Sequence, residues 1–187
     1  PTLDLVTMVY GGYINKNLVA KLQAQGVNAA GFTGADLDLI RAEIRPKEPL
    51  DFGYVGDIKK VKGEVLSELC SQGVVPVIAP LSHDGKGQIL NSNADNMAAY
   101  IAIATAGFAH TSLTFCFEQQ GVLCDGDLIK ALKEDDFAKL KDEKVITNGM
   151  IPKMDLAFQA VHSGVGKVRI CKFDALHNYE SGTEILI

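Results

Sequence analysis

Two short polar segments, far apart in the sequence, carry residue types suited to holding an anionic ligand. The segment Asn91–Asp95 reads Asn-Ser-Asn-Ala-Asp and supplies amides and a carboxylate, whereas Gly149–Lys153 reads Gly-Met-Ile-Pro-Lys and supplies a lysine. Each stands where a strand or loop runs into a helix, and the N-terminus of a helix attracts anions through its dipole and its free N–H groups. Together they predict a site that holds a phosphorylated ligand beside a small acidic one.

Each of these residues also has an ordinary structural explanation when it is taken singly. Lys153 is either a solvent-exposed lysine or a clamp that offsets charge on a transferring phosphoryl group. Asp95 either stabilises the start of its helix, by about 0.3–1 kcal/mol, or orients lysines around a phosphate. Asn91 and Asn93 either form turns and caps or bind an amide and a carboxylate of a small ligand.

Helices and strands alternate along the chain, and these elements must position the two polar segments. Apolar residues at helical spacing predict helices over residues 3–10, 15–25, 63–72, 94–107 and 152–164. Short apolar runs predict strands over residues 27–32, 74–79, 112–117, 167–172 and 182–187. Residues 51–61 are expected to hold one or two short strands, residues 83–87 to form a hairpin turn, and residues 121–144 to be irregular to helical. This order predicts an α/β fold, a three-layer sandwich with a mainly parallel central sheet and helices on both faces.

Two glycines are expected to interrupt the first helical pattern. Gly11 and Gly12 stand between the apolar positions of residues 3–10 and those of residues 15–25. Glycine disfavours helix interiors because it loses the most conformational freedom on folding. We therefore expect two separate helices here.

Composition and charge narrow the class of protein. The 187 residues are 47% hydrophobic with a formal net charge of −5, which is ordinary for a globular chain and argues against nucleic acid as a partner. No apolar run reaches the length of a membrane span, and the start of the chain lacks the pattern of a signal peptide. Neither the four histidines nor the four cysteines have metal-ligand spacing, so no metal ligand is predicted. Cys70, Cys116 and Cys171 have apolar neighbours in the sequence and are expected to be reduced core thiols of a cytoplasmic protein.

Seven segments, in order, resemble the motifs of the acetylglutamate kinases, within the amino acid kinase family. They are Gly11–Lys16, Gly31–Asp36, Gly53–Gly56, Gly73–Pro80, Asn91–Asp95, Gly149–Lys153 and Gly182–Thr183. Each is weak alone, but their number and order make the resemblance specific, and it runs over nearly the whole chain. It implies the amino acid kinase (carbamate kinase-like) fold.

The resemblance also implies a reaction and the residues that perform it. Members of this family transfer the γ-phosphoryl group of ATP, with Mg²⁺, to the side-chain carboxylate of N-acetyl-L-glutamate in arginine biosynthesis. By matched position, Asn91 would bind the acylated glutamate, Lys153 would stabilise the transition state and Asp95 would hold the lysines in place. The nucleotide wall would comprise Gly121, Val122, Leu123, Val145, Ile146 and Thr147. The acceptor carboxylate is already ionised at neutral pH, so no general base is required.

Two departures from the family pattern leave alternatives open. The family's first strand, its Gly-rich loops and an arginine for the substrate have no counterpart after Pro1, so residues 1–187 are expected to be a partial kinase domain of a longer protein. The family usually has an aspartate after the strand that corresponds to residues 112–117, and this chain has none at that position. The base and ribose side of the nucleotide site therefore departs from the family pattern, and Glu118 is the residue that could replace the aspartate. The alternatives are a kinase of N-succinyl-L-glutamate and a non-catalytic domain that binds acylated glutamate or nucleotide. The resemblance implies a homodimer through the helix that contains Asn15.

Overall fold

The computed structural model describes residues 2–124, 126–146 and 149–187, and the chain divides into two compact units. Unit 1 ends at Phe108 and unit 2 begins at Ala109. Each unit contains its own paired strands and helices, so each is described by itself.

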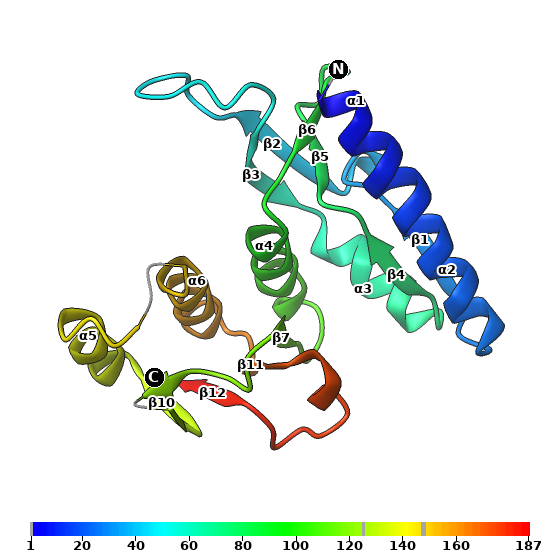
Figure 1. The fold of residues 1–187 in the computed structure, drawn as a ribbon. Coiled ribbons are helices and arrows are strands. Elements are labelled where there is room, and N and C mark those ends of the chain that lie inside the picture. Colours follow the sequence, from blue (N-terminus) through cyan, green and yellow to red (C-terminus); the bar gives the residue numbers. More distant parts are fainter. Residues whose placement is uncertain (1, 125, 147–148) are drawn as a thin grey trace. The chain divides into compact units, whose positions relative to one another are not determined.

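One continuous helix opens unit 1 (Figure 1). It consists of α1 (Thr2–Val6), the π-helical segment η1 (Thr7–Ile14) and α2 (Asn15–Ala24). The predicted break at Gly11 and Gly12 is therefore wrong. A Cβ atom on Gly11 would lie 3.1 Å from Cδ1 of Leu81, so this glycine permits close packing against a strand instead of ending the helix.

The rest of unit 1 consists of paired strands, one short 3₁₀-helix (η2) and two further α-helices. Its elements are β1 (Ala29–Phe32), η2 (Asp36–Asp38), β2 (Ile40–Ile44), β3 (Gly56–Val61), α3 (Gly63–Ser71), β4 (Val75–Ile78), β5 (Leu81–His83), β6 (Ile89–Asn91) and α4 (Ala94–Ala106). β1 pairs in parallel with β4, and four strands form a sheet in the order β3-β2-β5-β6. In that sheet β2 and β5 are parallel, whereas the predicted hairpin β5–β6 and the pair β2–β3 are antiparallel. Pro76 is compatible with β4 because, among the described residues, β4 pairs on one side only.

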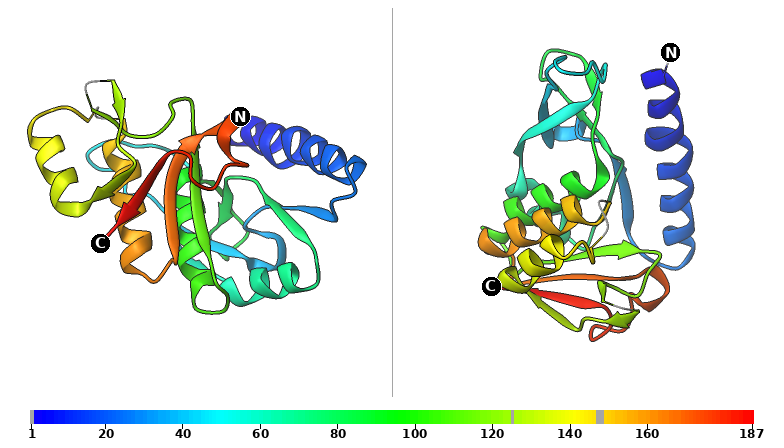
Figure 2. Two further views of the ribbon diagram at one scale, coloured as in Figure 1. Left: turned by 90° about the horizontal axis from the view of Figure 1, so that it is seen from below. Right: turned by 60° about the vertical axis from the view of Figure 1, so that its left-hand side comes forward.

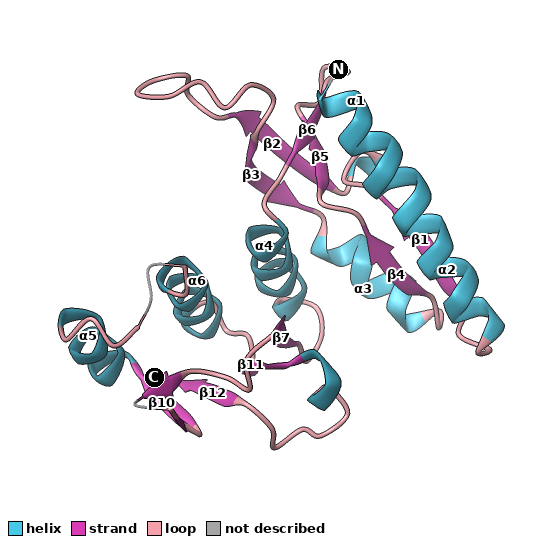
Figure 3. Ribbon diagram, in the orientation of Figure 1, coloured by secondary structure: helices cyan, strands magenta, loops and turns pink. Residues whose placement is uncertain are grey.

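Helices pack against both faces of the β1–β4 pair, as expected for an α/β fold. α2 contacts both strands, and α3 contacts β4 from the other side (Figures 2 and 3). α4 packs on α3 and on β3. Its residue Met97 is buried with the core residues of this region, which are Leu39, Ile40, Ile58 and Leu66.

Unit 2 is built around a four-stranded sheet. Its elements are β7 (Ser112–Phe117), β8 (Leu123–Cys124), β9 (Asp127–Leu128), β10 (Ala131–Lys133), α5 (Glu134–Asp142), α6 (Ile151–His162), β11 (Lys167–Lys172), η3 (Phe173–Ala175) and β12 (Thr183–Leu186). The sheet order is β10-β12-β11-β7, in which β7 runs parallel to β11, β10 runs parallel to β12, and β11 runs antiparallel to β12. The described part of residues 121–144 contains three short strands that the sequence did not reveal, because two or three residues are too few to show a period.

The prediction that Cys70, Cys116 and Cys171 all lie in the core is only partly correct. All four thiols are free, and Cys171 is buried, but Cys70 and Cys116 are exposed. Cys116 has apolar neighbours in the sequence, but successive side chains of a strand point to opposite faces. None of the helices in the described parts of the chain is long and apolar enough to span a membrane.

Candidate functional site

Asn91 lies on the wall of a cavity of about 580 Å³ in unit 1. The opening helix contributes Leu3 and Asp4 to the cavity, and the segment before β3 contributes Phe52 and Tyr54. Ligand cavities commonly measure about 300–1,000 Å³ and combine an apolar lining with a few polar groups. This cavity has the size and the mixed lining that a small polar molecule requires.

Hydrogen bonds made by Asn91 and by the residue after it fix the position of Asn91. Its N–H group donates a hydrogen bond to the carbonyl of Tyr54 at 2.9 Å. The next side chain, Ser92, is buried; its hydroxyl lies 2.7 Å from the hydroxyl of Ser82 and donates to the carbonyl of Gly56 at 3.2 Å. A side chain on such a fixed backbone can bind a ligand at a low entropic cost.

The residues after Asn91 begin helix α4. Oδ1 of Asn93 accepts a hydrogen bond from the N–H group of Asn96 at 3.0 Å, which makes Asn93 the N-cap. Of its two predicted roles, the structure supports capping. Asp95 lies half-buried in the first turn of α4, where a carboxylate favours the helix dipole.

Lys153 is a buried side chain at the start of α6. It is 9% exposed, so the interpretation as a solvent-exposed lysine is wrong. Its Nζ atom lies 4.9 Å from the ring centroid of Phe117 and 5.6 Å from that of Phe115, both on β7. Aromatic faces attract a cation through the ring quadrupole, which helps to hold a lysine charge out of bulk water.

Two segments of the predicted nucleotide wall meet in unit 2. Val122 and Leu123 share a cavity of about 140 Å³ with Val145 and Ile146, which are more than twenty residues away in the sequence. Gln119 and Met150 complete its lining. The predicted residue Thr147 lies outside the described residues.

Thr183 fixes the backbone of this wall, a role that the sequence did not reveal. It is 0% exposed; its Oγ1 accepts a hydrogen bond from the N–H group of Val122 at 2.8 Å and donates one to the carbonyl of Ile129 at 2.6 Å. A Cβ atom on Gly121 would lie 2.6 Å from the same Oγ1. The signal in the sequence was the Gly182–Thr183 motif, but a motif does not show which backbone groups a hydroxyl will reach.

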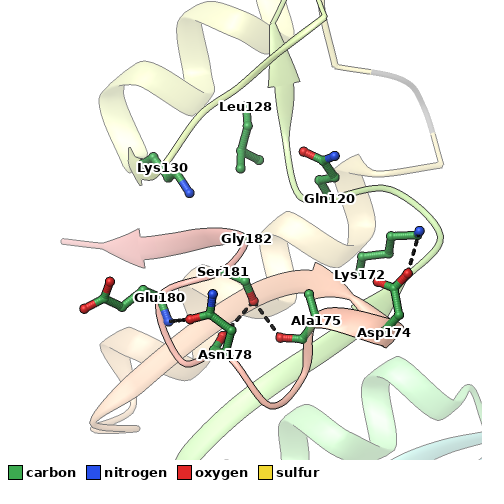
Figure 4. A pocket seen from close by; sticks show the side chains of 10 residues that line it. All are labelled: Gln120, Leu128, Lys130, Lys172, Asp174, Ala175, Asn178, Glu180, Ser181 and Gly182. Carbon is green, nitrogen blue, oxygen red and sulfur yellow. Dashed lines mark hydrogen bonds and ion pairs between the residues drawn. The ribbon is translucent and has the colours of Figure 1, made fainter.

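A second cavity of unit 2, of about 450 Å³, was also not predicted (Figure 4). Lys172 and Asp174 lie on its wall as an ion pair, with Nζ and Oδ2 2.7 Å apart, and Lys130 adds another cation. The hydroxyl of Ser181 donates a hydrogen bond to the carbonyl of Asn178 at 2.7 Å and thereby closes the loop before β12.

Arg169 of β11 holds this loop from within the protein. Its side chain is 4% exposed and donates to the carbonyls of Leu176 at 2.9 Å and Asn178 at 2.7 Å. Its Nε atom donates to Oγ1 of Thr114 at 3.1 Å. The loop between β11 and β12 is therefore fixed by a buried guanidinium group.

An ion-pair cluster in unit 1 fixes the turn that leads into β2. Asp38 has a positive φ of 57°, and its carboxylate accepts hydrogen bonds from the Nε and Nη2 atoms of Arg41 at 2.6 and 3.0 Å. Nζ of Lys62 lies 3.0 Å from the same carboxylate. Arg41 first, and then Lys62, hold the pKa of Asp38 well below its usual range.

A family model and a curated relative both match most of this chain. A family model described as "Amino acid kinase family" matches residues 1–172. The acetylglutamate kinase of Bacteroides fragilis is 47% identical over 188 residues, which cover 98% of this chain and 72% of that protein.

Solved structures show the same fold. An N-acetylglutamate synthase from Neisseria gonorrhoeae, complexed with coenzyme A and N-acetyl-glutamate, has a TM-score of 0.86 at 20% identity, covering 99% of this chain and 43% of that one. A carbamate kinase from Giardia has a TM-score of 0.64 at 13% identity, covering 94% of this chain and 70% of that one. At these identities the likeness concerns the fold alone, and it confirms the predicted carbamate kinase-like α/β fold.

Proposed function

Because this chain belongs to the amino acid kinase family, and within it to the acetylglutamate kinases, we propose that it phosphorylates N-acetyl-L-glutamate. The γ-phosphoryl group of ATP passes to the side-chain carboxylate, a step of arginine biosynthesis. The observation that carries the proposal is the joint presence of the cavity at Asn91 and the buried cation at Lys153. We also propose that the two units belong to one kinase domain of a cytoplasmic protein.

The acylated glutamate is assigned to the cavity of about 580 Å³ in unit 1. The Asn91 amide both donates and accepts hydrogen bonds, so it can bind the amide or a carboxylate of this substrate. The apolar side chains of Leu3, Val6 and Val55 also line the cavity and suit an acyl methyl group. The described lining contains the carboxylate of Asp4 and neither lysine nor arginine, which favours acetyl over the negatively charged succinyl group.

Lys153 is assigned to the transition state. Charge spreads over the oxygens of the transferring phosphoryl group, and a preorganised cation stabilises it most where water is excluded. The 9% exposure of Lys153 and the rings of Phe115 and Phe117 provide such surroundings. The N-terminus of α6 adds N–H groups that favour the same negative charge.

The nucleotide is assigned to unit 2. The apolar cavity between Leu123 and Ile146 suits the flat face of a base, and Thr183 holds the backbone of its wall in place. Gly121 lets the wall pack directly against Thr183, because a Cβ atom on Gly121 would lie only 2.6 Å from Oγ1 of Thr183. Mg²⁺ would neutralise charge on the phosphate oxygens when bound. Magnesium usually keeps several water ligands beside the phosphate oxygens that it contacts.

Asp95 is assigned a positioning role. It stands half-buried in the first turn of α4, four residues after Asn91. A carboxylate there can orient lysine side chains without itself accepting a proton from the substrate. The proposed mechanism is therefore positioning together with electrostatic stabilisation.

We further propose a homodimer through the opening helix. The helix presents large apolar side chains to solvent, notably Leu5, Met8, Tyr13 and Leu18, which are 58%, 63%, 73% and 45% exposed. Contiguous exposed apolar surface commonly marks a protein interface. Met8→Glu should therefore convert a dimer to a monomer in sedimentation analysis, whereas a Lys21→Glu control on the same helix should not.

An ATP-consumption assay on this polypeptide and on its full reading frame, with N-acetylglutamate and N-succinylglutamate side by side, tests the function. We expect phosphorylation of N-acetylglutamate and a Michaelis constant for it that rises in Asn91→Ala. Faster turnover of N-succinylglutamate would overturn the assignment of the acyl group. Ligand binding without turnover in every form would favour a non-catalytic binding domain.

A further inference from the structure

Two of the four cysteines face each other across neighbouring strands of unit 2. In the parallel pair of β7 and β11, Cys116 is the register partner of Cys171. Neighbouring strands lie about 4.8 Å apart, within the Cα separations of about 4.4–6.8 Å that a disulfide spans. The backbone can therefore accommodate a bond between the two sulfur atoms.

A second register pair shows that the two thiols share one face of the sheet. Thr114 and Arg169 are register partners two residues earlier on the same strands, and Nε of Arg169 donates to Oγ1 of Thr114 at 3.1 Å. Residues two apart on a strand point to the same face. The side chains of Cys116 and Cys171 therefore lie on the face where Thr114 and Arg169 already meet.

The two thiols differ in their access to solvent. Cys116 is exposed, whereas Cys171 is 0% exposed and lies under Gly182. A Cβ atom on Gly182 would lie only 2.7 Å from the Cβ atom of Cys171, so the loop before β12 covers this residue closely. An oxidant in solution therefore reaches Cys116 first, and Cys171 is close enough to react with the oxidised sulfur of Cys116.

We propose that Cys116 and Cys171 form an oxidisable dithiol, which hydrogen peroxide converts to an intramolecular disulfide. The thiolate of Cys116 attacks a peroxide oxygen, the O–O bond breaks, hydroxide leaves, and a sulfenic acid forms. Cys171 gives its proton to solvent and attacks the sulfur of Cys116, so that the S–S bond forms, the S–O bond breaks and hydroxide leaves. Overall, two thiols and one hydrogen peroxide give one disulfide and two waters.

The electrostatic surroundings set the pH dependence of this reaction. Cys116 is exposed as a residue, but the surrounding protein partly desolvates its thiol, and this desolvation, and then the neighbouring Cys171, raise the pKa of the thiol. Since the thiolate is the nucleophile, oxidation is slow at neutral pH, and below the pKa its rate rises about tenfold for each pH unit. A single thiol with no second thiol beside it shows the same pH dependence of oxidation, but it cannot form an intramolecular disulfide.

Peptide mass spectrometry of the peroxide-treated wild-type chain tests the proposal. We expect a linked pair of peptides containing Cys116 and Cys171, restored to free thiols by dithiothreitol. The number of free thiols should fall from four to two. The trivalent arsenical phenylarsine oxide, which requires two adjacent thiols, should bind one equivalent per chain and block the oxidation.

Cysteine variants separate this pair from the other thiols. Cys116→Ser should lose both the cross-link and the arsenical binding, whereas Cys70→Ser, which removes an exposed thiol on α3, should keep both. Oxidation of Cys116 to sulfinic acid while Cys171 stays a free thiol would overturn the proposal. Failure of the wild-type chain to bind phenylarsine oxide would also overturn the proposal, and this result does not depend on the folding of any variant.

Discussion

Replacing Thr183 with valine removes a hydroxyl group from the interior of unit 2 and keeps nearly the same side-chain shape. The substitution leaves the N–H group of Val122 and the carbonyl of Ile129 without the partner that now lies at 2.8 and 2.6 Å. A buried backbone group without a partner costs about 1–3 kcal/mol. Because Thr183 is 0% exposed, water cannot replace the hydroxyl without a rearrangement. We therefore expect a loss of about 2–4 kcal/mol in the free energy of unfolding.

Thr183→Ser is the matched control, since it keeps the hydroxyl and removes one methyl group. Loss of a buried methyl group costs about 1 kcal/mol. Urea unfolding followed by circular dichroism should therefore place the midpoint of the valine variant well below that of the serine variant, with the same slope. If the two variants unfold within about 0.5 kcal/mol of each other, the hydroxyl does not stabilise the fold as argued.

The same pair of variants also tests the nucleotide assignment. If the backbone of Val122 forms part of the nucleotide wall, Thr183→Val should raise the Michaelis constant for ATP and leave that for the acylated glutamate unchanged. A destabilised variant with an unchanged constant for ATP would keep the structural role of Thr183 and refute the position of the nucleotide. Steady-state kinetics in the full reading frame distinguishes these outcomes.

Three further substitutions test other parts of the structure. Lys153→Ala should lower the turnover number by about 10²–10³, the effect of losing one preorganised donor, and near-wild-type turnover would refute its role. Gly121→Ala should cost about 1–3 kcal/mol in stability because the added Cβ atom would lie 2.6 Å from Oγ1 of Thr183; an unchanged urea midpoint would contradict this. Asp38→Asn should lower the melting temperature at neutral pH, because a depressed carboxyl pKa stabilises the fold above the unfolded value of about 3.9. That difference should shrink as the pH falls below about 4, and a difference that grows on acidification would show that the ion pairs with Arg41 do not carry it.

The sequence sufficed for the fold class and for most regular elements. Strands with continuous apolar runs, such as those over residues 112–117 and 167–172, were predicted close to their observed bounds, and so were the C-terminal ends of the helices that precede Gly26 and Gly73. Such elements are determined locally, because apolar period, chain length and a glycine with positive φ act within one segment. The family followed from the order of several short motifs, and the comparisons confirm it.

Local pattern failed where a distant residue decides the outcome. Gly11 looks like a helix breaker, but its missing side chain makes room for Leu81, which is seventy residues away in the sequence. Taken alone, Lys153 was compatible with a solvent-exposed lysine until its burial and the aromatic rings of β7 beside it were known. The short strands of residues 121–144 depend on pairing with other strands and not on their own composition.

The sequence by itself thus determined which residue types are available for chemistry and which elements carry them. Tertiary structure alone decided that Val122 and Ile146 share a cavity, that Thr183 fixes its wall and that Cys116 meets Cys171. The physical reason is that burial, hydrogen-bond partners and cross-strand register are properties of pairs of segments. A pattern read along one segment contains no information about the segment that will lie against it.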